Sequence, residues 1–292
     1  MHSNRRRFLS LAAAAAVAGC TGDESEGETA DQAGATTTAT PTSSPTPAPA
    51  AFDITSYDVP DRVEIGESAT VSVTAENVGG QPSEFAASLL IEAPDGNKNE
   101  SVEVSFGRIE PDESATVEVG PFSFVYLGPH SVRVGGQSPT VIVQAVPASS
   151  TWETAYRVPR GYDLTVSEPS LQDTFAYEGG YDDIERRGPS GDRQWAFVDV
   201  SVTNQADTAV SAPSADDFVL VGADTKYDSY ALADDPINKG ERLRSGNVPP
   251  GETRSGWVSY AIATDLAVGD IDVRWSTTTR SGEIAVRWSS RG

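Results

Sequence analysis

The sequence predicts an all-β protein of two antiparallel β-sandwiches, preceded by a signal peptide and a disordered stalk. From residue 52 onward, short segments with an apolar residue at every second position recur along the chain. Such alternation is typical of strands that bury one face. Clusters of Gly, Pro, Asn and Asp separate these segments, as turns require. Residues 52–292 are long enough for two ordinary domains.

The chain begins with a basic segment followed by an apolar one. Three arginines at 5–7 precede the apolar run 8–18, which has the length of a signal-peptide core and is too short to span a bilayer. This arrangement resembles the twin-arginine export signal. The residues that carry the resemblance are Arg5, Arg6, Phe8 and Leu9.

Cys20 is the only cysteine in 292 residues, so the chain can form no internal disulfide. A single thiolate builds no zinc site unaided, and a catalytic thiol needs a nearby base. Residues 17–20, Val-Ala-Gly-Cys, resemble a lipobox. The resemblance implies removal of residues 1–19 and lipidation of Cys20, which would hold the protein on the extracellular face of the cell membrane. The alternative is an uncleaved membrane-embedded segment with an inert cysteine.

Residues 20–51 are predicted to form a lipid-anchored, disordered stalk. Positions 21–51 carry no aromatic and no large aliphatic residue, so they bury too little apolar area to offset the loss of backbone entropy. Their Thr, Ser and Pro content resembles that of O-glycosylated stalks.

The chain is strongly acidic, with 43 Asp and Glu against 21 Lys and Arg and a net charge of −22. Acids spread along the whole chain, with few lysines, resemble proteins of extreme halophiles, in which high salt screens the self-repulsion. A basic partner is the alternative. Nucleic-acid binding is disfavoured, because phosphates would be repelled.

Residues 52–147 are predicted as the first sandwich. The segment 68–76, SATVSVTAE, places Ala69, Val71, Val73 and Ala75 on one face. EIGESATV at 64–71 returns as EPDESATV at 110–117 and, more loosely, within VPPGETRSGWV at 248–258. Because the flanking residues differ, we interpret these copies as a recurring turn before a strand. Positions 52–144 resemble the CARDB and related Ig-like adhesion modules.

Residues 148–292 are predicted as the second sandwich. Ala196, Val198, Val200 and Val202 share one face of a strand, and the segments DIDVRWS and EIAVRWS read as a hairpin. Four of the tryptophans in this half are interpreted as core residues, namely Trp195, Trp257, Trp275 and Trp288. Segments 195–210, 214–227 and 248–262 resemble the DUF4352-type Ig-like domain of exported lipoproteins, a family that implies an architecture and a location more than an activity.

No motif for covalent chemistry or cofactor binding is present, so we predict no catalytic residue, no cofactor and no enzyme. His130 is the only histidine outside the signal. Paired acids at 182–183, 216–217 and 234–235 keep calcium open as a disfavoured alternative, without an EF-hand pattern. A hydrolase that uses two carboxylates is a further alternative.

Two segments, 176–194 and 231–247, are long for sandwich loops, where binding surfaces usually lie. The first mixes tyrosine and arginine, which protein interfaces favour, and a solvated insertion is the alternative. Its candidate interaction residues are Tyr177, Tyr181, Arg186, Arg187 and Arg193. Asn99 belongs to the one Asn-x-Ser/Thr sequence and is a candidate N-glycosylation site.

The sequence thus predicts a non-enzymatic, extracellular lipoprotein that acts as an adhesion, scaffold or protein-interaction module. Its expected partners are the membrane, through the lipid anchor, and a cell-surface protein or glycan. An extracellular solute- or calcium-binding lipoprotein is the alternative.

Replacement of Cys20 by alanine removes the predicted acylation site. We expect the Cys20→Ala protein to leave the membrane fraction or to remain unprocessed, because no lipid chain would then hold it in the bilayer. Fractionation and mass spectrometry of the N-terminus measure this. Unchanged membrane retention of a fully processed variant would contradict lipidation.

Overall fold

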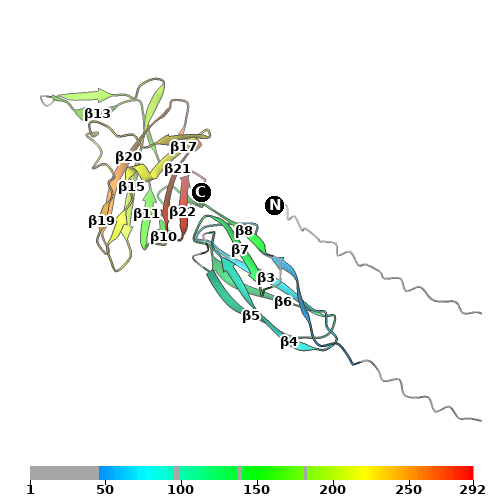
Figure 1. Ribbon diagram of the computed structural model, residues 1–292. Helices are drawn as coiled ribbons and strands as arrows, with labels where there is room; N and C mark the ends of the chain where they lie inside the picture. The colour runs from blue at the N-terminus through cyan, green and yellow to red at the C-terminus, as the bar shows by residue number, and fades with distance from the viewer. Residues whose placement is uncertain (1–45, 95, 97–98, 137–139, 181–182, 292) are drawn as a thin grey trace, which may run out of the picture. The chain divides into compact units, whose positions relative to one another are not determined.

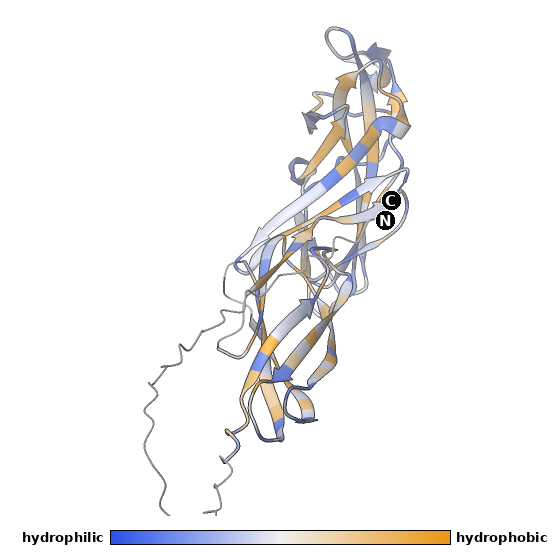
Figure 2. Cartoon of the chain, turned by 90° about the vertical axis from the view of Figure 1, so that its right-hand side faces the viewer, coloured by the Kyte–Doolittle hydropathy of each residue, from blue (hydrophilic) through white to orange (hydrophobic). Residues whose placement is uncertain are grey.

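The computed structural model describes residues 46–291 except 95, 97–98, 137–139 and 181–182. Within it, Pro47–Gly292 forms one compact unit. The predicted signal, Cys20 and most of the predicted stalk lie outside the described residues. The all-β prediction is confirmed: the described residues form strands and two short 3-10 turns, Ala215–Asp217 and Val268–Asp270. Apolar and polar residues alternate along many of the strands, as Figure 2 shows.

The described residues form twenty-two strands, many of which Figure 1 labels. Those of the first sandwich are β1 (Phe52–Asp58), β2 (Arg62–Glu64), β3 (Ser68–Asn77), β4 (Ser83–Glu92), β5 (Asn99–Ile109), β6 (Ser114–Ser123), β7 (Gly128–Val134) and β8 (Val141–Val146). Those of the second are β9 (Ala148–Thr151), β10 (Tyr156–Val158), β11 (Tyr162–Val166), β12 (Ser170–Gln172), β13 (Phe175–Glu178), β14 (Ile184–Arg187), β15 (Arg193–Asn204), β16 (Val210–Ala212), β17 (Phe218–Gly222), β18 (Thr225–Asp228), β19 (Gly246–Val248), β20 (Thr253–Ala263), β21 (Ile271–Thr279) and β22 (Gly282–Ser289).

The first sandwich packs a three-stranded sheet, β1-β3-β6, against a five-stranded sheet, β2-β8-β7-β4-β5. The apolar face predicted for β3 is buried, since Ala69, Val71, Val73 and Ala75 are 0–8% exposed. Strand pairs are antiparallel except β2 with β8, which is parallel. Burial of this face removes apolar area from water and drives the two sheets together.

The second sandwich centres on β15, which pairs with β11 and β12 along one edge and with β20 along the other. The facing sheet has the order β18-β17-β21-β22-β9. Ala196, Val198, Val200 and Val202 lie in the shared core, as predicted. The hairpin predicted for the two C-terminal segments is β21 with β22. All four predicted core tryptophans are at most 2% exposed.

The two sandwiches repeat one arrangement of strands. The set β1-β3-β6 of the first corresponds to β11-β15-β20 of the second, and β2-β8-β7-β4-β5 corresponds to β9-β22-β21-β17-β18. In both, the first strand of the five-stranded sheet runs parallel to its neighbour. The one difference within this correspondence is chain order, because β1 precedes β2 whereas β9 precedes β11.

A buried asparagine ends the central strand of each sandwich in the same way. The side-chain amide of Asn77 donates to the carbonyls of Gln81 and Ile109 at 2.8 and 3.0 Å, and its oxygen accepts from the amide N–H of Gly79. Asn204 donates to Thr208 and Val248, both at 2.8 Å, and accepts from Ala206. These bonds satisfy both ends of each buried amide.

The backbone around these asparagines is also matched. The carbonyl of Asn77 accepts from Asp112, and that of Asn204 accepts from Gly251. Asp112 and Gly251 have positive φ angles of 60° and 74°, in the left-handed conformation that this turn requires. The copies of the recurrent segment at 110–117 and 248–258 therefore occupy equivalent positions in two repeated domains, a relation that their flanking residues do not reveal.

Truncation of Asn204 tests this arrangement. We expect Asn204→Ala to lower the free energy of unfolding by about 2 to 4 kcal/mol, because it leaves buried backbone groups unpaired. Urea unfolding measures the change. The matched control is Asn247→Ala on the exposed face of β19, which should cost less than about 0.5 kcal/mol. Equal stability of the two variants would show that the buried amide contributes nothing.

Candidate functional site

The sheet around β15 and β20 is apolar on both of its faces. Trp195 and Phe197 alternate along β15 with the core-facing residues and point to the opposite side, where they meet Trp257 of β20. With Phe175, Tyr177 and Ala261 these residues form a second hydrophobic cluster. Phe197 lies 5.8 Å from Trp257 in an edge-to-face contact. A sheet of this kind must be covered on its second face, since exposed aromatic area is costly.

The two long loops supply this cover. The first folds into the hairpin of β13 and β14. The second, predicted at 231–247, spans residues 229–245 between β18 and β19 and crosses the sheet beside the hairpin. The indole N–H of Trp195 donates to the carbonyl of Arg187 at 3.1 Å, and that of Trp257 donates to Gly240 at 2.7 Å. Each loop is thus fixed to the sheet by one buried tryptophan. Figure 1 shows β13 extending away from the β15–β20 sheet.

Polar contacts fasten the hairpin to the second loop. Arg187 donates to the carboxylate of Asp234 and lies over the ring of Tyr177, with 4.7 Å between its Cζ and the ring centroid. The Tyr177 hydroxyl donates to Glu185, and this hydrogen bond, together with burial, raises the pKa of Tyr177. The amide of Ile237 donates to the carbonyl of Ala176 at 3.0 Å.

The structure divides the predicted interaction residues into two groups. Tyr177 is 7% exposed, and Arg187 is held between its partners, so these two position the hairpin. Arg186 and Arg193 are exposed and can meet a partner. Tyr181 lies outside the described residues.

Exposed apolar side chains gather on the same two loops. Ile184 is 70% exposed, Tyr230 50% and Ile237 40%, and these are three of the five large hydrophobic residues exposed in the described part of the chain. Sequence reasoning missed them. The available signal was an isoleucine within an otherwise polar hairpin, Asp-Asp-Ile-Glu-Arg-Arg.

The paired acids do not form a metal centre in the described part of the chain, where no three His, Cys, Asp or Glu side chains gather around a possible ion. Asp216 accepts from the hydroxyl of Ser229 and lies 3.6 Å from Arg242. Asp234 pairs with Arg187, and Asp182 lies outside the described residues.

Two other residues singled out from the sequence have structural positions. His130 is 4% exposed, contacts Phe124 edge-to-face at 5.1 Å, and has Nδ1 3.2 Å from the carbonyl oxygen of Gly128. Asn99 begins β5. Among the described residues, no helix has the length and apolar character needed to cross a membrane.

Residues 167–268 match a family model described as a domain of unknown function, DUF4352. This match confirms the resemblance predicted for the second sandwich. It covers the hairpin, the second loop and the sheet beneath them. No curated protein matches the chain significantly.

Several experimentally determined structures align with about half of this chain at low sequence identity. A candidate lipoprotein of Bacillus subtilis, ycdA, is 16% identical with a TM-score of 0.32, over 49% of this chain and 40% of that one. The yjhA protein of the same organism is 15% identical with a TM-score of 0.34, over 48% and 99%. An uncharacterised β-sandwich protein of Clostridium difficile is 10% identical with a TM-score of 0.31, over 49% and 94%.

Replacement of Arg187 tests how the hairpin is held. We expect Arg187→Gln to release the hairpin locally, because it removes both the ion pair with Asp234 and the contact with Tyr177. Amide hydrogen exchange in residues 175–187 should accelerate while the melting temperature changes little. Arg186→Gln is the control, since that side chain is exposed. Identical exchange in both variants would contradict the fastening role.

Proposed function

We propose that this chain is a non-enzymatic protein of the cell surface that binds a partner protein through the loops of its second sandwich. The supporting observation is the exposure of Ile184, Tyr230 and Ile237 on loops that are themselves fixed to a rigid sheet. Exposed apolar side chains held by a rigid scaffold can bind without a large ordering cost.

The exposed arginines define the chemistry of the partner surface. Arg186 is exposed on β14 with Ile184, and Arg193 is exposed at the start of β15, so a complementary surface would offer an apolar pocket with acidic groups at its rim. The aromatic cluster under the loops is fully buried and lends rigidity to the contact. Binding by this surface needs no catalytic group, in keeping with the absence of catalytic motifs from the sequence.

The location that we propose follows from the sequence. Twin-arginine export through Arg5, Arg6, Phe8 and Leu9 would precede lipidation at Cys20, so that residues 20–51 link the anchor to the first sandwich. We further propose a CARDB-like spacer role for the first sandwich and a high-salt environment for the acidic surface.

Site-specific cross-linking on intact cells tests the proposal. A photo-reactive residue placed at Ile184 should give a discrete cross-linked product, whereas the same residue at Ile142 should give none. Ile142 is the matched control because it is 51% exposed on a strand of the first sandwich. In parallel, Ile184→Asp should abolish a cross-link from position 237, while Ile142→Asp should leave it. Equal products from both sites, or none from either, would overturn the proposal.

A further inference from the structure

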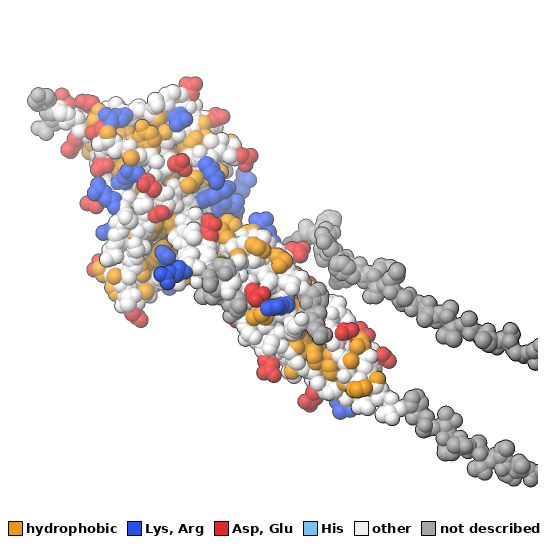
Figure 3. Space-filling model, viewed as in Figure 1, with side chains coloured by type: hydrophobic (Ala, Val, Ile, Leu, Met, Phe, Trp, Pro, Cys, Tyr) orange, Lys and Arg blue, Asp and Glu red, His pale blue; other side chains and the backbone are white. Residues whose placement is uncertain are grey.

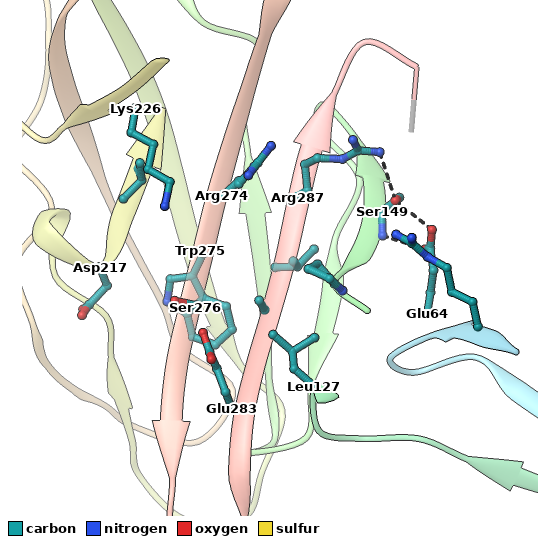
Figure 4. Close-up of a pocket in the computed structure, with 15 residues that line it drawn as sticks. Glu64, Leu127, Ser149, Asp217, Lys226, Arg274, Trp275, Ser276, Glu283 and Arg287 are labelled. Carbon is teal, nitrogen blue, oxygen red and sulfur yellow. Dashed lines mark hydrogen bonds between the residues drawn. The ribbon is translucent and has the colours of Figure 1, made fainter. Parts of the chain in front are cut away.

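A pocket of about 420 Å³ lies on the outer face of the five-stranded sheet of the second sandwich, on the opposite side of the domain from the loop-covered cluster. Its walls come from β17, β18, β21, β22 and β9 and from the first sandwich, where β2 contributes Arg62 and Glu64 and the segment before β7 contributes Leu127 (Figure 4). Its volume lies within the range of small-molecule sites. None of its lining residues belongs to the surface proposed above.

Cations are concentrated in this pocket although the chain is strongly acidic. Arg274 of β21 stands directly opposite Arg287 of β22, and Lys226 of β18 lies on the same side. Like charges placed opposite each other across two strands repel. Asp272 lies 3.6 and 3.7 Å from the two guanidinium groups and offsets only part of this repulsion. Figure 3 shows basic side chains gathered beside β17 and β21.

A hydrogen bond to β9 holds the side chain of Arg287 in place. Arg287 donates to the hydroxyl of Ser149 at 3.3 Å. The amide and hydroxyl of Ser149 in turn donate to the carboxylate of Glu64 at 2.8 and 2.9 Å (Figure 4). This chain of hydrogen bonds orients the guanidinium before any ligand arrives, which lowers the entropy cost of binding.

The opposite end of the pocket carries acidic side chains. Figure 4 shows Lys226, Arg274 and Arg287 at one end, and Asp217 and Glu283 at the other. The lining also includes Ser276 and the apolar residues Ala285 and Leu127.

A ligand that matches this arrangement carries an oxyanion at one end and hydroxyl groups at the other, on a body with an apolar face. The guanidinium groups would take the oxyanion through charge-assisted hydrogen bonds. The carboxylates would accept from the hydroxyl groups. We propose that this pocket binds an acidic saccharide, with the carboxylate of the sugar at Arg274 and Arg287.

Titration of the mature chain with glucuronate, glucose and inorganic sulfate tests this inference by calorimetry at constant ionic strength. Glucuronate should bind measurably, glucose should not, and sulfate should bind more weakly than glucuronate. The Arg274→Gln/Arg287→Gln variant should bind glucuronate on the order of tenfold more weakly or worse, because two charge-assisted contacts are lost. Amide NMR shifts induced by glucuronate should map to β21, β22 and β9.

The control is Arg108→Gln/Arg133→Gln, which removes the same charge from two exposed ion pairs of the first sandwich. It should retain full affinity. Equal affinity for glucose and glucuronate, equal loss in both double variants, or shifts outside the pocket strands would overturn the proposal. Sulfate binding as tight as glucuronate would overturn the saccharide assignment. These outcomes are independent of cross-linking at position 184.

Discussion

The second sandwich depends on a sheet that is apolar on both faces. Along β15, small and branched residues face one side and large aromatic residues face the other, so a single facing sheet cannot bury the strand. The domain resolves this by covering the second face with its own loops. The length of these loops, their tryptophan anchors and the apolar side chains that they carry outward all follow from that requirement.

Much of the fold could be predicted because period-two alternation reports directly on burial. The core faces of β3 and β15 and the C-terminal hairpin all follow from it. The two-sided burial of β15 could also be seen in QWAFVDVSVTN, where apolar residues interrupt the strict alternation at Trp195 and Phe197. What covers that second face depends on tertiary contacts, such as Trp257 with Gly240, that no local pattern encodes.

The candidate site was predicted in part. The sequence singled out the segment 176–194 by its length, and the structure folds it into the β13–β14 hairpin and the start of β15. Composition alone did not distinguish Tyr177 and Arg187, which hold the hairpin, from the exposed Arg186. Residue type could not separate these roles because tyrosine and arginine serve both interfaces and buried ion pairs. The sequence also did not reveal that the two sandwiches share one arrangement of strands. The repeat is carried by two asparagines and one turn, while the remaining residues differ.

A single residue, Pro147, separates β8 from β9, and each of these strands runs parallel to a partner within its own sheet. Tension applied along the chain would therefore pass along both strands and load their interstrand hydrogen bonds in shear. All hydrogen bonds of a strand pair would then resist the force together. A force that peeled the strands apart from one end would instead break these hydrogen bonds one at a time, at a smaller force. This arrangement of β8 and β9 would give the folded part of the chain resistance to mechanical pulling.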